Sequence, residues 1–135
     1  MGHGKLEAER PLSPHLQIYR PMLTMMMSIA HRISGAALAT GFLLLAWWLV
    51  AIAAGPEQYA TVASFFASIV GRGLLFLYSW ALIHHMLGGI RHLIWDTGHG
   101  LDLVSIEWFA WATIIGSTVL NVLLWVAGHW LKGAF

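Results

Sequence analysis

Three long uncharged segments constrain the fold of this chain more than any other feature. The segments 33–54, 73–90 and 108–131 contain no Asp, Glu, Lys or Arg. A helix needs roughly 17–25 mostly apolar residues to cross the hydrocarbon core of a bilayer, which is about 30 Å thick. Backbone polar groups inside that core must be paired within the segment, and an α-helix does this. We therefore predict an all-α integral membrane protein with three transmembrane helices.

The composition agrees with this prediction and excludes several classes of protein. Of the 135 residues, 59% are hydrophobic and only 10% are charged, with a mean hydropathy of +0.71. Soluble domains carry roughly 25% charged residues. Eight tryptophans, most of them near the ends of the apolar segments, fit interfacial anchors. The absence of cysteine excludes disulfides and iron–sulfur ligation by this chain, and the net charge of +1 argues against a nucleic-acid partner.

Prolines and glycines give the expected boundaries. Residues 1–23 are predicted to form an extended surface arm on the cytoplasmic or matrix side, since proline lacks a backbone donor and disfavours helix in the preceding residue. A disordered tail is the alternative for this arm; otherwise His15, Ile18 and Tyr19 are available for docking on a partner. Residues 24–135 form the transmembrane domain.

The transmembrane domain is expected to contain helices at about 25–54, 61–97 and 108–131. Thr24 is the expected N-cap of the first helix. Gly98 and Gly100 are expected to end the second helix. Small residues at four-residue spacing in the first helix predict a close-packing face; these are Gly35 with Ala39 and Ala37 with Gly41.

Lysine and arginine are distributed unevenly around the three segments, which predicts an orientation. Most of them fall on the side of the N-terminus, namely Lys5, Arg10, Arg20, Arg32 and Arg91, while Arg72 and Lys132 fall on the other side. By the positive-inside rule, the N-terminus faces the cytoplasm or matrix. The first 20 residues show neither a secretory signal nor a presequence, which favours a bacterial inner-membrane subunit or a processed organellar one.

A histidine-rich stretch closes the second apolar segment. On a helix, seven residues turn about 700°, so His92 lies within about 20° of His85 and roughly 10 Å further along the axis. Gly89 leaves a gap on nearly the same face, and Asp96 lies one turn beyond His92. His84 is rotated by about 100° from His85, so we expect a structural role for it. This stripe fits a flat, bulky cofactor that lies beside the helix.

A second polar cluster occupies the opening turns of the first helix. Because the second helix returns to the side on which the first begins, Ser28, His31 and Arg32 are expected at the same membrane depth as His92 and Asp96. A b-type haem fits this arrangement, with iron on a neutral imidazole and propionates near cationic groups. A quinone fits as well, since Ser28 and Arg32 are one turn apart and can both donate to one carbonyl oxygen.

Three motifs in order carry a resemblance to a known family. They are Arg10-Pro-Leu-Ser-Pro-His-Leu-Gln-Ile-Tyr19, Ser28-Ile-Ala-His-Arg-Ile-Ser-Gly35 and His85-x-x-x-Gly-Ile-Arg-His-Leu-x-Trp-Asp96. Together they resemble the cytochrome b556 membrane-anchor subunits of succinate dehydrogenase, or respiratory complex II. The resemblance covers essentially the whole chain, and three ordered motifs are more specific than any one of them.

The resemblance implies a haem b that is shared with a second, smaller anchor subunit, the two subunits forming one helical bundle. His85 matches the family's axial ligand to the haem iron, and the second axial histidine comes from the smaller subunit. His31 and His92 match histidines near the haem propionates. The succinate-oxidising site lies on partner subunits, so no catalytic residue is expected in this chain.

The resemblance also implies a ubiquinone-reduction site. Ser28 and Arg32 match the family's quinone-site residues, and Asp96 and Asp102 match acidic positions linked to proton delivery. An iron–sulfur subunit and a flavoprotein subunit would pass electrons from succinate to this site. The implied location is the bacterial inner membrane, or the mitochondrial inner membrane if the chain is organellar.

Several alternatives stay open at this point. The chain could be a purely structural anchor without a redox role, or a subunit of another haem b cytochrome that reacts with quinone. A stand-alone di-haem cytochrome is disfavoured, because the third helix offers only His129, at its far end. His85 could instead bond a neighbouring helix, and Arg32 could bind lipid phosphate. Arg91 could snorkel, contact a partner or contact a propionate.

The third helix carries only modest polar groups. Ser117, Thr118 and Asn121 are expected to make hydrogen bonds to a neighbouring helix.

Overall fold

The computed structural model describes residues 13–14 and 16–134, without the side chains of residues 16 and 132–134. A short 3-10 helix, η1 (Leu16–Ile18), precedes four α-helices. These are α1 (Leu23–Ala54), α2 (Pro56–Ala67), α3 (Ile69–Asp96) and α4 (Leu103–Ala134). Helices α1, α3 and α4 are long and apolar enough to cross a membrane. The predicted all-α fold with three spanning helices is therefore confirmed.

The first spanning helix begins earlier than expected and is not capped by Thr24. The N-cap residue is Met22, whose side chain makes no capping hydrogen bond. The helix ends at Ala54, as predicted, and Gly55 follows with a φ of 120°. A side chain is strained at this φ, so glycine suits the position. Pro56 then occupies the first turn of α2, where its missing N–H costs nothing.

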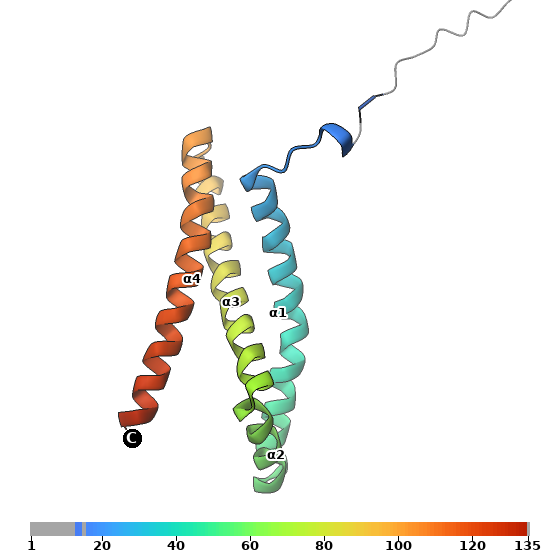
Figure 1. The fold of residues 1–135 in the computed structure, drawn as a ribbon, viewed down its shortest axis with the longest axis vertical. Coiled ribbons are helices and arrows are strands. Elements are labelled where there is room, and N and C mark those ends of the chain that lie inside the picture. The colour runs from blue at the N-terminus through green and yellow to red at the C-terminus, as the bar shows by residue number, and fades with distance from the viewer. Residues whose placement is uncertain (1–12, 15, 135) are drawn as a thin grey trace, which may run out of the picture.

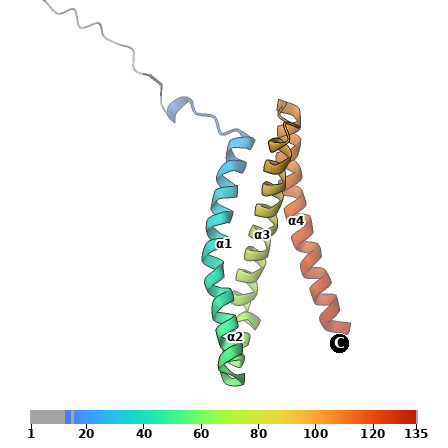
Figure 2. The ribbon, with the colours of Figure 1, turned by 180° about the vertical axis from the view of Figure 1, so that it is seen from behind.

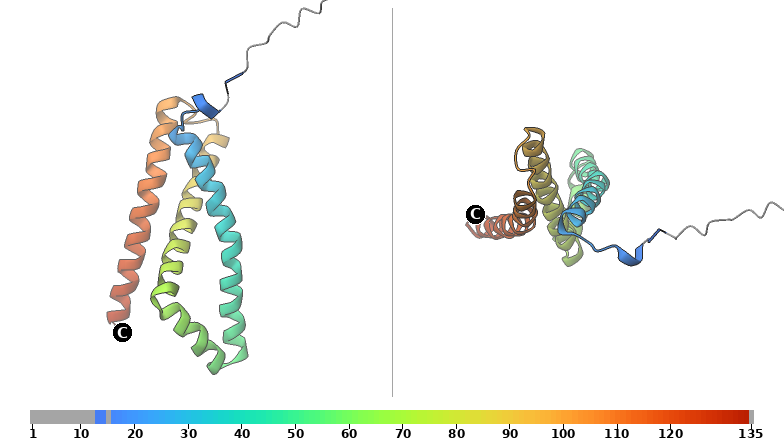
Figure 3. Two further views of the ribbon diagram at one scale, coloured as in Figure 1. Left: turned by 45° about the vertical axis from the view of Figure 1, so that its right-hand side comes forward. Right: turned by 90° about the horizontal axis from the view of Figure 1, so that it is seen from above.

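The single helix expected over 61–97 is divided at Ser68 into α2 and α3. Ser68 has an extended ψ of 163°. Its hydroxyl donates to the Phe65 carbonyl at 2.6 Å and accepts from the Gly71 N–H at 3.1 Å, so it caps α3. A Cβ at Gly71 would collide with the Phe65 carbonyl oxygen, which explains a glycine at this corner. Helix α2 runs obliquely between α1 and α3 (Figure 3).

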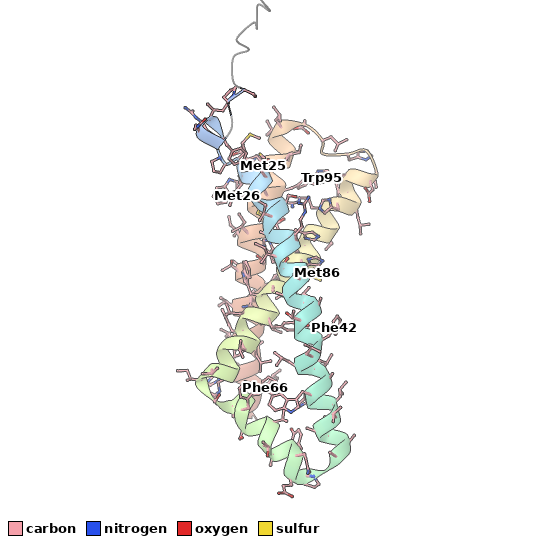
Figure 4. All side chains as sticks on the ribbon, turned by 90° about the vertical axis from the view of Figure 1, so that its right-hand side faces the viewer. Met25, Met26, Phe42, Phe66, Met86 and Trp95 are labelled. Carbon is pink, nitrogen blue, oxygen red and sulfur yellow. The ribbon has the colours of Figure 1, made fainter. Side chains whose placement is uncertain are left out.

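Aromatic side chains fill the corner between α2 and α1. The Trp47 ring lies 5.5 Å from the Phe65 ring and 6.0 Å from the Phe66 ring, measured between centroids. Figure 4 shows Phe66 at this end of the molecule. Tilted aromatic pairs of this kind stabilise the contact beyond their buried area.

The turn between α3 and α4 follows the glycine pattern. Gly98 and Gly100 have φ values of 79° and 68°, and they end α3 as expected. Asp102 accepts a hydrogen bond from the Ser105 N–H at 2.9 Å, which starts α4 at Leu103 rather than near residue 108. The hydroxyl of Ser105 and nearby backbone N–H groups lower the pKa of the Asp102 carboxyl.

Helix α3 lies between α1 and α4 (Figures 1 and 2). The start of α1, the end of α3 and the start of α4 share one end of the bundle. Of the two small-residue pairs expected on α1, only the glycines face α3. The Tyr78 ring occupies the space that a Cβ at Gly41 would fill, while Ala37 and Ala39 are exposed.

Hydrogen bonds between side chains join α3 to α4. Ser79 donates to the Asn121 side-chain oxygen at 2.7 Å, and the Asn121 amide donates to the Phe76 carbonyl at 3.3 Å. The Trp80 indole donates to Thr118 at 3.3 Å, and the His84 ring lies 3.2 Å from the Ser117 hydroxyl. The interhelical hydrogen bonds expected of Ser117, Thr118 and Asn121 are therefore confirmed.

Candidate functional site

Three histidines meet where α1 packs against α3. The rings of His31 and His85 are stacked, with centroids 4.0 Å apart and planes at 4°. The His92 ring lies 5.3 Å from that of His31, at 56°. Thus the histidines expected near a cofactor lie together, although they come from segments more than 50 residues apart in the sequence.

Glycines make room for the stacked pair, each on the helix opposite its histidine. A Cβ at Gly35 would lie 2.9 Å from the His85 ring, and a Cβ at Gly88 would collide with the His31 ring. A Cβ at Gly89, in contrast, would meet nothing within 4 Å. The open space expected beside Gly89 is therefore present. The packing role of Gly88 was missed, although its position in the Gly-Gly pair was a signal.

The hydrogen bonds of His85 fix which ring nitrogen carries the proton. Its Nδ1 lies 3.1 Å from the His31 carbonyl oxygen and 3.2 Å from the Ser34 hydroxyl oxygen. A carbonyl oxygen can only accept, so in the neutral ring Nδ1 carries the hydrogen and Nε2 keeps its lone pair. Within the part of the chain that the structure describes, Nε2 has no hydrogen-bond partner, and it is not among the fully buried polar atoms. It can therefore coordinate a metal.

His84 faces the other side of α3. Its side chain is 2% exposed, its Nδ1 bonds Ser117, and its ring stacks on Trp80 with centroids 4.9 Å apart. As expected from the 100° rotation between neighbours on a helix, His84 does not share the space around His85. Its surroundings are those of a packing residue.

Ser28 and Arg32 are both exposed on α1, one helical turn apart, and Arg32 directly follows His31 in the sequence. Neither makes a side-chain hydrogen bond or ion pair with another residue that the structure describes. Their donors are therefore free to meet a ligand or a partner chain that lies against this end of α1. The geometry is compatible with the expected pair of donors to one oxygen.

The other candidate residues, Asp96, Asp102 and Arg91, lie around the same end of the bundle. Asp96 and Asp102 are exposed, at the end of α3 and just before α4. Arg91 is 5% exposed, and its guanidinium carbon lies 5.1 Å from the Trp95 ring centroid. This burial disfavours snorkelling, one of the three alternatives left open for Arg91. Of the arm, Ile18 and Tyr19 are exposed, and His15 lies outside the described residues.

The described residues include no group of three or more His, Cys, Asp or Glu side chains that could hold a bare metal ion. A metal bound at His85 would therefore need most of its ligands from elsewhere. A cofactor that carries its own metal meets this requirement with a single protein ligand per helix face.

These features define a class: a multi-span helical membrane protein with a histidine site between two helices. Residues 7–131 match the family described as succinate dehydrogenase/fumarate reductase transmembrane subunit, and the chain belongs to this family. The expected family resemblance is confirmed.

Individual relatives agree along most of their lengths. The chain is 45% identical to the succinate dehydrogenase cytochrome b556 subunit of Paracoccus denitrificans, covering 84% of this chain and 88% of that one. It is 39% identical to the cytochrome b556 subunit of Rickettsia prowazekii, over 87% and 92% of the two chains. It is 36% identical to the mitochondrial cytochrome b560 subunit of Mus musculus, over 86% and 68%.

Proposed function

We propose that the chain anchors a succinate:ubiquinone oxidoreductase in the membrane, supplies one axial ligand to a b-type haem and contributes to the ubiquinone-reduction site. The observation that carries the proposal is the hydrogen bonding of the His85 ring. Its Nδ1–H is held by a backbone carbonyl of the opposite helix, and its Nε2 is left with a lone pair. The ring nitrogen of a metal-ligating histidine that does not bind the metal usually donates its N–H in this way.

The residues around His85 fit a haem. The space beside Gly89 is open, one turn from His85 on nearly the same face. The His31 ring stacks on that of His85, and the His92 ring lies 5.3 Å from that of His31, so both could meet the propionates of a haem bound at His85. When bound, the haem supplies a one-electron redox centre. The relatives' names contain cytochrome b, which implies a haem. We expect the second axial histidine to come from the smaller anchor subunit.

Ser28 and Arg32 would bind and orient ubiquinone. Both are exposed at the same end of the bundle as the histidine site, and both are donors. The Arg32 guanidinium would stabilise the negative charge that develops on the quinone oxygen as it is reduced. Asp96 and Asp102, exposed at the adjoining turn, would deliver protons from the same side.

The soluble partners would dock on this end. An iron–sulfur subunit would bring electrons to the quinone, and a flavoprotein subunit would oxidise succinate. The positive-inside rule puts this end, with the N-terminus, in the cytoplasm or matrix. The corresponding location is the bacterial inner membrane or, for an organellar chain, the mitochondrial inner membrane.

The quinone assignment is tested with Arg32→Leu in the assembled complex, beside Arg72→Leu as a control. Both arginines are exposed; Arg32 lies in the first third of α1 and Arg72 in the first turn of α3. The starts of these two helices lie at opposite ends of the bundle (Figure 1). Loss of a charge-stabilising donor costs roughly 10²-fold or more in rate. We expect Arg32→Leu to lower succinate–ubiquinone reductase activity by this order while succinate–dye reductase activity and the Arg72→Leu variant stay normal. Near-normal quinone reduction in Arg32→Leu would contradict the assignment.

If the chain is a purely structural anchor, different results are expected for the same assembled complex. Its dithionite-reduced minus oxidised spectrum would contain no b-type haem bands. Quinone analogues would not inhibit the complex through residues of this chain.

A further inference from the structure

Ser34 is a buried hydroxyl on the face of α1 that packs against α3. Its side chain is 4% exposed. It lies seven residues from both Met27 and Gly41, which are buried as well, so the three share one stripe. A buried hydroxyl costs free energy unless it is hydrogen-bonded. The partners of Ser34 are therefore informative.

The Ser34 hydroxyl joins His85 to the backbone of α1. It donates to the His31 carbonyl at 2.8 Å, and its oxygen lies 3.2 Å from His85 Nδ1. Because the hydroxyl hydrogen is directed at the carbonyl, the oxygen is left to accept from Nδ1–H. His85 Nδ1 thus donates to two acceptors, the Ser34 oxygen and the His31 carbonyl oxygen.

We propose that Ser34 is a positioning residue for the haem ligand. With the His31 carbonyl it holds the proton on Nδ1, fixes the rotation of the His85 ring and directs Nε2 toward the cofactor. This inference rests on the proposed ligation of haem by His85. Acceptors at Nδ1–H raise the basicity of a ligating imidazole, which stabilises the oxidised metal. Ser34 therefore lowers the midpoint potential of the haem.

Thr40 provides a matched control on the same helix. Its hydroxyl donates only to carbonyls of α1 itself, those of Ala36 at 3.3 Å and Ala37 at 2.9 Å, and its side chain is exposed. Thr40→Ala and Ser34→Ala each remove one hydroxyl that bonds the α1 backbone. Only Ser34→Ala removes a contact to His85.

The experiment is redox potentiometry of the haem in the purified complex, together with the low-spin EPR spectrum of the oxidised haem. We expect Ser34→Ala to raise the midpoint potential and change the EPR g-values, and Thr40→Ala to match the unmodified complex in both. An unchanged or lowered potential in Ser34→Ala would overturn the inference. Succinate–dye reductase activity reports in parallel whether the soluble subunits are intact.

Ser34→Cys keeps the inference testable if Ser34→Ala does not assemble. The thiol has nearly the same shape and is a weak acceptor, so the potential should rise here too. A potential equal to that of Thr40→Ala would overturn the inference. His85→Ala distinguishes a failure of the proposed function from a failure of the role of Ser34. If His85→Ala keeps an unchanged haem, the proposed function fails; if it loses the haem while both Ser34 variants match Thr40→Ala, only the role of Ser34 fails.

Discussion

His84 and His85 are neighbours in the chain and occupy opposite environments. Both rings bond through Nδ1, His84 to Ser117 of α4 and His85 to the His31 carbonyl and Ser34 of α1. The Nε2 of His84 is fully buried without a partner among the described residues, whereas that of His85 is not enclosed. Access to the second nitrogen, rather than residue type or hydrogen bonding, therefore distinguishes a candidate ligand from a packing residue.

The interfaces of α3 with α4 and with α1 also differ. Toward α4, side chains such as Asn121 and Ser79 bond each other and the backbone, which fixes the two helices together. Toward α1, Gly35 and Gly88 let two imidazole rings enter the contact. One interface is a rigid support, and the other leaves functional groups available. A site held on a packed helix pair keeps its geometry more precisely than a site on a loop.

The largest expected difference is between His85→Ala and His84→Ala. We expect His85→Ala to abolish the b-type haem spectrum of the assembled complex, because it removes the proposed iron ligand. His84→Ala should keep the haem and lower stability by roughly 0.5–3 kcal/mol, the usual range for a destabilising single substitution. Haem content by pyridine haemochrome assay and thermal denaturation measure the two effects. Equal haem loss in both variants would erase the distinction between the faces.

The next difference is between two glycines. A Cβ at Gly88 would collide with the His31 ring, whereas a Cβ at Gly116 would lie 3.3 Å from the tip of Leu87, which can move aside. Overpacking of a tight contact costs about 1–3 kcal/mol. We expect Gly88→Ala to destabilise the complex by this amount and perturb the haem spectrum, and Gly116→Ala to do neither. Similar stabilities for the two variants would show that the α1–α3 contact is not tight.

A smaller effect is expected from Asn121→Leu on the α4 side. The change keeps the number and branching of the side-chain heavy atoms and removes the bonds to Ser79 and the Phe76 carbonyl. Interhelical hydrogen bonds in membranes average about 0.6 kcal/mol and reach about 1.7 kcal/mol. Thermal stability should therefore fall modestly, while the haem potential stays unchanged. A shifted haem potential would mean that the α3–α4 interface and the histidine site between α1 and α3 are coupled.

The smallest effect concerns Asp102, at the turn that both faces share. Asn caps helices as well as Asp, so Asp102→Asn should keep stability at neutral pH, and Asp102→Ala should lower it. The pKa of Asp102 is lowered in the folded chain, so the ionised side chain stabilises the fold above about pH 4, the ordinary pKa of a carboxyl. This stabilisation is lost as the pH falls through the pKa that Asp102 has in the folded chain. Melting curves at pH 7 and pH 3 measure this. A role in proton delivery predicts slower quinone reduction in Asp102→Asn despite normal stability.

Much of the fold could be predicted, because charge, hydropathy and glycine act locally. The uncharged segments gave the spans, and Gly98 with Gly100 gave the end of α3. The break at Ser68 could not be predicted, since no proline or glycine occupies that position. It depends on the Ser68 cap and on Trp47 from another helix packing at the corner.

The histidine site was predictable only in part. Helical periodicity put His85, Gly89 and His92 on one face, and helix direction put His31 at the same depth. The burial of Arg91, the packing of Gly88 and the bond from Ser34 to His85 depend on how α1 and α3 are rotated about their axes. Sequence periodicity fixes a face of one helix, but not which face of the next helix meets it.

The most direct measurement is a cryo-EM structure of the assembled complex that resolves the side chains of α3. We expect haem iron bound to Nε2 of His85, with the Nδ1–H of His85 donating to the His31 carbonyl, and His84 against Ser117. Iron bound to His84, or a His85 ring that faces lipid with no cofactor beside it, would contradict the proposed ligation by His85.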